Sequence, residues 1–480
     1  MSKKNQNYTN RKQNRFQPER MRENVFLNNS GKQWLPGENG RAAKVEMLLR
    51  GTKQEKKEIA GNMAGYKDSG VEWIGEIPEE WKVIPLKYIT KCKDSQRIPI
   101  DVTKREHGRF PYWGAGGITD YVSSYIFDEE LVLLGEDAAP FLDKKRDVAF
   151  LVNDKIWVNN HIHVLKANKN LNASYLRHCL NITQYEEFIF GSVIPKLTQT
   201  DMKKIPVTLP PLAEQQRIAD FLDTKCGILD RTIDAVSRQI EDLEKYKKAL
   251  ITKTVTKGIC KKGEPERAMK DSGVEWIGEV PEEWSVSKVK HETSFIGSGT
   301  TPRSSCLSFY ENGTIPWIQS GDLYETNEVT DTKQKITSEA LRSSSALKVY
   351  DKDFIAMAMY GSIGNIAISR IAACVNQACC CLRPNARNNL NYMYYFLKAS
   401  TDNFKSKAMG AVLQNISQEK IKKQDFLVPP LAEQQQIADY LDEKCKNIDN
   451  RVQKRREQLE WLKEYKKSLI FDYVTGKKRV

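Results

Sequence analysis

Three groups of residues in this chain have types and spacings that could support catalysis or metal binding. Asp68, Glu80 and Lys82 resemble the two carboxylates and lysine of a metal-dependent nuclease. His161 and His163 lie two residues apart, so on a strand they would share one face, as two metal ligands might. The third group is a set of cysteines near residue 380. Each group can be tested against a repeat in the chain.

The repeat argues against a nuclease. Residues 68–81 (DSGVEWIGEIPEEW) recur 203 positions later as residues 271–284 (DSGVEWIGEVPEEW), with 13 of 14 positions identical. Ser285 stands in the second copy where Lys82 stands in the first, so the lysine of the nuclease set is missing there. A self-similarity this long instead reports an internally repeated architecture.

The same comparison argues against a metal site. The counterparts of the two histidines are Ala378 and Cys380, so we expect satisfied strand residues, or single contacts to a base or phosphate. Cys374 and Cys379–Cys381 have no histidine nearby, and three adjacent residues on a strand point to alternate faces. The sequence therefore predicts no metal site.

Two familiar catalytic motifs are absent from the sequence. There is no GxxxxGK[ST] phosphate-binding loop. The Pro-Pro pairs that begin at Pro210 and Pro429 follow Leu209 and Val428, where an adenine methyltransferase would carry Asp or Asn. We therefore expect no catalysis and no cofactor in this chain. The missing motifs also argue against a self-sufficient methyltransferase.

A second repeat marks the start of two long helices. PPLAEQQRIADFLD from Pro210 recurs as PPLAEQQQIADYLD from Pro429, 219 positions later, with 12 of 14 positions identical. Apolar residues then follow a 4-3 heptad spacing in both copies, broken by Arg455 and by a lysine in each helix (Lys247 and Lys466). The predicted seam residues are Leu222, Leu229, Ile233, Val236, Ile240, Leu243, Leu250, Leu441, Ile448, Val452, Leu459, Leu462 and Leu469.

Each seam is too narrow for a globular core, so the two helices are expected to pack on each other. Connectivity favours an antiparallel coiled coil, because a large domain lies between the end of one helix and the start of the other. A hairpin that only dimerises the protein is the simpler alternative, but it does not explain two large unlike domains at a fixed distance.

The two segments between the repeats share a faint common frame. WVNNHIHVL from Trp157 aligns with CVNQACCCL from Cys374, and PYWGAGGI from Pro111 aligns with PWIQSGDL from Pro316. Short β-rich runs broken by Gly and Asn predict mixed α/β domains. One scaffold with two different surfaces is expected when two copies read two different things.

The chain resembles the specificity subunits of type I restriction-modification systems over residues 66–480. The resemblance is carried by the YKDSGVEWIGEIPEEW opening, the PPLAEQQ helix entries, the YKK-LI exits (Tyr246–Ile251 and Tyr465–Ile470), and the GSGTTP and IPWIQSGDL phrases (Gly297–Pro302 and Ile315–Leu323). It implies two target-recognition domains that each read one half of a split DNA site, with the helices as a ruler. It also implies modification subunits that bind the repeats and methylate adenine with S-adenosylmethionine, and restriction subunits that use ATP. The alternative from another class is a coiled-coil scaffold that does not read DNA.

The expected layout is an α/β domain, a helix, a second α/β domain and a second helix. The formal net charge is +13, but residues 1–65 carry +8 of it and read as a basic, disordered extension without a counterpart in the family pattern. Ten scattered cysteines without a CxxC pair favour reduced thiols and a cytoplasmic protein. The predicted divisions are residues 1–65, 66–209 (recognition domain 1), 210–258 (helix), 259–268 (linker), 269–428 (recognition domain 2) and 429–480 (helix).

Reading of base edges needs Arg, Lys, Asn, Gln, Ser or Thr on loops that face a groove. Positions that differ between the copies are favoured over shared ones such as the Val-Asn pairs at 158–159 and 375–376, which we expect to hold the scaffold. In the first domain the candidates are Lys104, Arg105, Arg109, Tyr112, Trp113, Lys144, Lys145, Arg146, Asn160 and Lys196. In the second they are Thr300, Thr301, Arg303, Gln319, Tyr360, Ser362, Gln377, Gln414 and Asn415.

Overall fold

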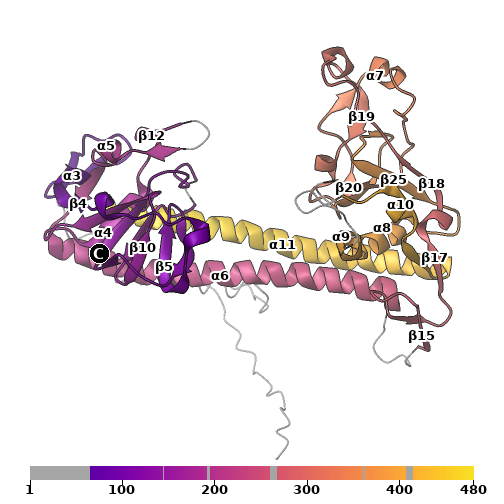
Figure 1. The fold of residues 1–480 in the computed structure, drawn as a ribbon, viewed down its shortest axis with the longest axis horizontal. Helices are drawn as coiled ribbons and strands as arrows, with labels where there is room; N and C mark the ends of the chain where they lie inside the picture. Colours follow the sequence, from indigo (N-terminus) through magenta and orange to yellow (C-terminus); the bar gives the residue numbers. More distant parts are fainter. Residues whose placement is uncertain (1–64, 144, 192–194, 260–266, 361–362, 407–414) are drawn as a thin grey trace, which may run out of the picture.

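The computed structural model describes residues 65–143, 145–191, 195–259, 267–360, 363–406 and 415–480. It has two globular parts, head 1 (residues 66–209) and head 2 (residues 269–428), at opposite ends of a pair of long helices (Figure 1). The extension expected at residues 1–65 lies outside the described residues except for Gly65. The boundaries of the expected domains stay predictions.

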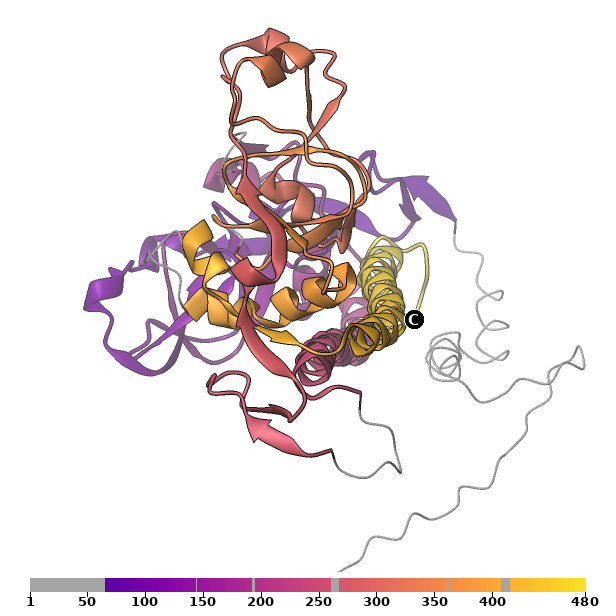
Figure 2. The same ribbon diagram turned by 90° about the vertical axis from the view of Figure 1, so that its right-hand side faces the viewer.

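Two helices form the rod that joins the heads. They are α6 (Leu212–Lys257, 46 residues) and α11 (Leu431–Val474, 44 residues), and Figure 2 shows them end-on and side by side. They are antiparallel, because Phe221 near the start of α6 contacts Tyr473 at the end of α11, with ring centroids 4.6 Å apart. The predicted antiparallel coiled coil is confirmed.

The predicted seam faces inward along the whole rod. Eight of its residues are buried, and the other five, Ile233, Ile240, Leu243, Leu250 and Leu459, are partly buried. Full burial of a leucine or isoleucine side chain contributes about 1.5–3 kcal/mol, so a seam of this length holds the two helices together.

The tryptophan that ends each first repeat binds the glutamate of the following second repeat. The Trp81 indole Nε1 donates to Glu214 Oε2 at 3.1 Å, and the Trp284 Nε1 donates to Glu433 Oε2 at 2.9 Å. Both indoles are completely buried. The two repeated phrases are therefore one structural unit made twice.

The glutamine after each glutamate binds the head that precedes its helix. Gln215 Oε1 accepts from the Asn172 N–H at 2.9 Å, and Gln434 Oε1 accepts from the Asn389 N–H at 2.8 Å. These asparagines are the N-caps of α4 (Ala173–Ile182) and α8 (Leu390–Ala399). Each rod helix is thus bonded to the capped helix of its own head.

The C-terminal end of each rod helix binds the copy of the first repeat in the head that precedes the other helix. The Tyr66 hydroxyl donates to the Gly476 carbonyl at 3.0 Å, and Arg479 pairs with Glu80, so head 1 holds the C-terminal end of α11. In the same way Lys257, at the end of α6, bonds the Glu279 carbonyl in the second repeat. Each head is anchored to both helices.

Head 1 contains two four-stranded sheets, with β8 completely buried at Leu131–Gly135. The order is β6-β5-β10-β7 in one sheet and β4-β11-β8-β9 in the other, and β5 pairs in parallel with β10. The remaining bounds are β1 Tyr66–Asp68, β2 Glu76–Pro78, β3 Lys82–Pro85, α3 Leu86–Ile89, β4 Thr90–Cys92, β5 His107–Gly114, β6 Gly117–Val122, β7 Phe127–Asp128, β9 Ala149–Val152, β10 Lys155–Val158, β11 Ile162–Ala167, β12 Ile189–Phe190, β13 Lys196–Leu197, α5 Gln199–Met202 and β14 Pro206–Leu209.

Head 2 repeats this plan with a five-stranded sheet, β18-β25-β22-β23-β20, and a three-stranded sheet, β21-β19-β24. The parallel pair β19–β24 corresponds to β5–β10 of head 1. Bounds are β15 Met269–Asp271, β16 Glu279–Pro281, β17 Ser285–Lys288, β18 Thr293–Ser298, β19 Ile315–Ile318, β20 Glu328–Val329, β21 Lys335–Ile336, α7 Ser338–Arg342, β22 Phe354–Ala358, β23 Ile366–Ser369, β24 Cys374–Val375, β25 Cys379–Pro384, α9 Thr401–Ser406, α10 Gln418–Lys422 and β26 Asp425–Val428. The expected mixed α/β fold with an internal repeat is confirmed.

None of the helices in the described ranges has the length and apolar content that crossing a bilayer requires.

Candidate nucleic-acid interface

In head 1 the loop after β10 is held rigidly and presents one amide side chain to solvent. Val158 and Asn159 are buried. The Asn159 N–H donates to the Trp113 carbonyl at 3.0 Å, and its side-chain oxygen accepts from the His161 N–H at 2.8 Å. Asn160, between these anchored residues, is exposed.

In head 2 the loop after β24 is built by the same bonds. The Asn376 N–H donates to the Ile318 carbonyl at 2.9 Å, and its side-chain oxygen accepts from the Ala378 N–H at 3.1 Å. Gln377 is exposed at the position that Asn160 has in head 1. The shared Val-Asn pairs therefore do hold the scaffold, and the residue after each pair differs between the heads.

A second segment lies beside the exposed amide of head 1. The Glu136 N–H donates to the His161 carbonyl at 3.0 Å, and Asp137 forms an isolated β-bridge with Lys196. The His161 Nδ1 lies 2.6 Å from Asp137 Oδ1. We call Asp137, Asn160, His161 and Lys196 rim 1.

The equivalent segment of head 2 makes the equivalent bonds. The Met359 N–H donates to the Ala378 carbonyl at 2.7 Å, and Tyr360 forms an isolated β-bridge with Asn415. Thr301 hydrogen-bonds the side chain of Gln377. We call Thr301, Tyr360, Gln377 and Asn415 rim 2.

The two rims share a backbone frame but differ in chemistry. Rim 1 carries charged and titratable side chains together with an amide, whereas rim 2 carries a hydroxyl, a phenol and two amides. Exposed amides and basic groups on a fixed frame are suited to bidentate bonds with base edges. Two such surfaces of different composition would read different sequences.

Comparison with known families shows to which protein family the chain belongs. The model of the type I restriction modification DNA specificity domain matches residues 78–245 and 281–460, more than two thirds of the chain. The chain belongs to this family. Each match begins near the end of a first repeat and includes a head and most of the following rod helix, so the specificity domain occurs twice.

Relatives along the whole chain agree with this assignment. The chain is 26% identical over 436 residues to the MjaX type I restriction enzyme specificity subunit of Methanocaldococcus jannaschii, covering 85% of this chain and 96% of that protein. It is 25% identical over 422 residues to the MjaVIII specificity subunit of the same organism, covering 84% and 94%. A solved structure from work on the assembly and conformational transition of the type I R-M system shares the fold, with a TM-score of 0.59 at 18% identity, covering 84% and 99%. The chain is therefore a specificity subunit, and its function is recognition of DNA sequence.

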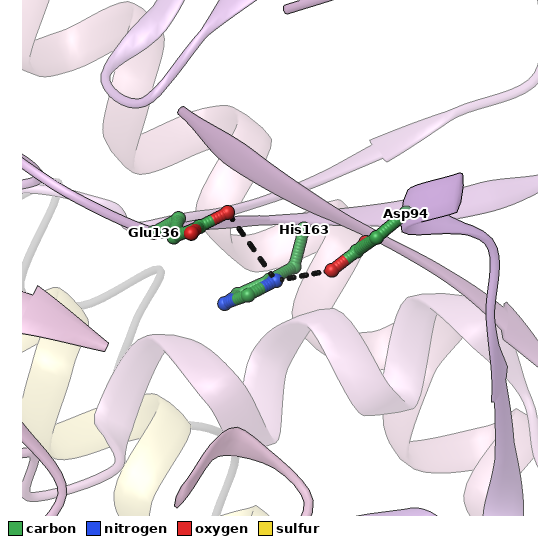
Figure 3. Close-up of side chains that lie close together, drawn as sticks. All are labelled: Asp94, Glu136 and His163. Carbon is green, nitrogen blue, oxygen red and sulfur yellow. Dashed lines mark hydrogen bonds and ion pairs between the residues drawn. The ribbon is translucent and has the colours of Figure 1, made fainter. Parts of the chain in front are cut away.

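Beneath rim 1 of this specificity subunit lies a buried ionic cluster, drawn in Figure 3. The His163 Nδ1 lies 2.6 Å from Asp94 Oδ2 and 3.8 Å from Glu136 Oε2, and its Nε2 lies 3.0 Å from the Leu197 carbonyl. Each ring nitrogen therefore faces an oxygen atom, and the ring lies between two carboxylates.

The neighbours of Asp94 keep it ionised. Burial raises the pKa of Asp94, but the hydrogen bond and charge of His163, the bond from the Val164 N–H and the charge of Arg97 outweigh it and bring the pKa to about 2. Arg97 Nη1 also lies 2.6 Å from Glu136 Oε2. The cluster ties together the segment after β4, the end of β8 and β11, and so supports rim 1 from below.

Asp94, Glu136 and His163 are the one group, within the described residues, whose potential metal-ligand atoms all lie within 4.8 Å of one another. Arg97 and Lys196 already pair with these carboxylates, and a divalent cation would have to displace them. In head 2 the counterpart of the histidine is the buried Cys380, whose thiol pKa burial raises above its usual value. The geometry fits a structural ion cluster better than a metal site.

Three of the predicted DNA contacts already have partners within the protein. Tyr112 is 1% exposed and its hydroxyl accepts from the Ile100 N–H at 3.2 Å. Arg105 stacks over the Tyr112 ring at 4.2 Å and pairs with Asp120 at 3.3 Å. Lys145 pairs with Glu460 of the rod. Contact of these three residues with DNA stays a prediction.

The other candidates fall into three groups. Five belong to neither rim, and of these Thr300 is partly buried and the others are exposed: Lys104, Arg109, Arg146, Thr300 and Arg303. Trp113 is partly buried against Phe150, and Gln319 bonds Gln334 at 2.9 Å. Lys144, Ser362 and Gln414 lie outside the described residues.

The list of candidate DNA contacts left out two rim residues, Asp137 and His161, although a contact to a base or phosphate was considered for His161. Tyr360, the counterpart of Asp137, was among the candidates, so an alignment of LVLLGED (from Leu131) with FIAMAMY (from Phe354) would have pointed to Asp137 by position.

Proposed function

We propose that each head reads one half of a bipartite DNA site and that the rod sets the distance between the halves. The observation that carries this is the equivalence of rims 1 and 2, which have the same backbone bonds and different side chains. A helix of 46 residues is about 69 Å long, roughly two turns of B-DNA. The rod is therefore long enough to separate two surfaces on one face of a duplex.

We further propose that the chain is non-catalytic and works within a larger complex. The repeated phrases present the same surface at two places, which suits two copies of one modification subunit. Restriction subunits would complete the complex. S-adenosylmethionine, ATP and Mg would then belong to those partners, and the complex would carry the adenine methyltransferase and ATP-dependent endonuclease activities.

The test is selection from a pool of random duplexes by the chain assembled with its modification partners. The proposal predicts a motif split into two short halves by a gap of fixed length. A scaffold that does not read DNA would enrich no motif. Replacing residues 82–209 with the same region of a relative should change one half only, and a change in both halves or in neither would contradict the division of labour.

A further inference from the structure

Lysines at matching positions form two exposed clusters beside the rims. Cluster 1 is Lys87, Lys203 and Lys204 in head 1, and cluster 2 is Lys290, Lys422 and Lys423 in head 2. Lys87 and Lys290 are 203 positions apart, the same offset as the two copies of the first repeat. Lys203 and Lys422 are 219 positions apart, as are Lys204 and Lys423, which is the offset of the second repeat. Four of the six are exposed and two are partly buried.

The fold brings cluster 1 together next to rim 1. The Lys87 N–H donates to the Lys203 carbonyl at 3.2 Å, which joins α3 to the end of α5, and Figure 1 shows these helices side by side. The Lys203 Nζ donates to Gln199 Oε1 at 2.9 Å, and Gln199 Nε2 donates to Asp94 Oδ2 at 3.3 Å. The cluster is thus bonded to the ionic group under rim 1, and Lys203 follows the rim residue Lys196 by seven positions.

Cluster 2 has the same arrangement in head 2. Lys422 pairs with Glu419 at 2.8 Å. The Val289 N–H donates to the Gln424 carbonyl at 2.9 Å, which joins the segment before Lys290 to the residue after Lys423. Lys422 follows the rim residue Asn415 by seven positions.

Each cluster keeps an excess of positive charge. Among the described residues, cluster 1 has one carboxylate partner, Asp201, which lies 2.8 Å from Lys204, just as cluster 2 has Glu419. Lysine Nζ is a point charge that suits a phosphate oxygen and gives no information on base identity.

The similarity of the two clusters, compared with the difference between the two rims, indicates what the clusters bind. The rims differ between the heads, as surfaces that read different bases must, whereas the clusters are the same in both. The phosphate backbone of duplex DNA is likewise the same at every half-site. We infer that clusters 1 and 2 bind DNA phosphates, one cluster at each half-site, and fix the register in which each rim meets the bases. This inference rests on the proposed function.

The test measures affinity against salt for the chain assembled with its modification partners. Replacing a phosphate-binding lysine lowers the slope of log K against log salt by about 0.9 and weakens all sequences alike. The double variants K203Q/K204Q and K422Q/K423Q should therefore each lower the slope by about two and leave the enriched motif unchanged. Lys155→Gln is the control, because Lys155 is 44% exposed at the far end of β10 from rim 1 and its counterpart is Ala372.

The outcomes are separable. An unchanged salt slope in both double variants would overturn the inference, and so would normal DNA binding combined with loss of the modification subunits, because the clusters would then be protein-docking surfaces. A changed base preference in one half would also overturn it, since the lysines would then read sequence. Failure of the unaltered assembly to enrich any split motif would instead contradict the proposed function.

Discussion

Lys247 Nζ in α6 lies 2.6 Å from Asp449 Oδ1 in α11. The pair has a symmetry mate: Lys466 Nζ lies 2.7 Å from Asp230 Oδ1, and both residues of one pair are 219 positions from those of the other. The two lysines interrupt the apolar seam, one in each helix. Each of these lysines meets a carboxylate of the facing helix, and the two pairs specify the register of the rod.

Reversing the charge of Lys247 should weaken the rod. Lys247→Glu would face Asp449 with a like charge and lower the free energy of unfolding by about 1 kcal/mol, a modest value because Asp449 is 41% exposed and screened by solvent. Adding Asp449→Lys should recover most of the loss, which a double-mutant cycle in urea unfolding would measure. Strictly additive effects would show that the pair does not contribute to register.

The bond between the repeats should contribute to stability. Glu433→Ala leaves the buried Trp284 N–H without its acceptor, and an unsatisfied buried donor costs about 1–3 kcal/mol. Glu433→Gln keeps an oxygen acceptor and should cost less. Equal unfolding midpoints for the two variants would contradict this role of the hydrogen bond.

The ionic cluster under rim 1 predicts an acid-sensitive contribution. The folded pKa of Asp94, about 2, lies below its ordinary value of 3.8, so the contribution is fully present above about pH 4 and is lost as the pH falls through 2. It amounts to about 2 kcal/mol at pH 7. Asp94→Asn should therefore lower the stability at pH 7 by about that amount and by clearly less at pH 3. A deficit that stays constant over this range would argue against an ionised Asp94 as its source.

The two equivalent amides should each affect one half-site. Asn160→Ala should relax one base position in the half read by head 1, and Gln377→Ala one position in the other half, each with a loss of about 1–3 kcal/mol in discrimination. Asn153→Ala is a matched control, because this exposed asparagine precedes β10 at the end away from rim 1. Base preference by position in the duplex selection is the readout, and relaxation in both halves from one substitution would contradict the assignment.

The rod and the common frame of the heads could be predicted from the sequence because both depend on local spacing. Heptads report which face of a helix is buried, and the Val-Asn phrases at 158–159 and 375–376 occupy the same place in both sheets. The ion pairs of Lys247 and Lys466 could not be predicted, because they depend on the axial register between two helices, which spacing along one helix does not fix.

The individual DNA contacts were harder to predict for a similar reason. Tyr112 was among the candidates expected on loops that face a groove, but it is buried in β5, which has a register shift at Tyr112 and Trp113 that breaks the simple alternation of faces. The cluster of Asp94, Glu136 and His163 joins residues from three separated segments, and only the folded sheet brings them together.

The most direct test of the account is to lengthen the rod without altering the heads. One heptad would be inserted in α6 after Val236 and one in α11 after Leu459, at the same axial level, so that the seam stays continuous. Seven residues add about 10 Å, or about 3 base pairs of B-DNA. The account predicts that duplex selection returns the same two half-sites with a gap wider by about that much. The original gap, or new half-sites, would contradict the rod as the element that sets their spacing.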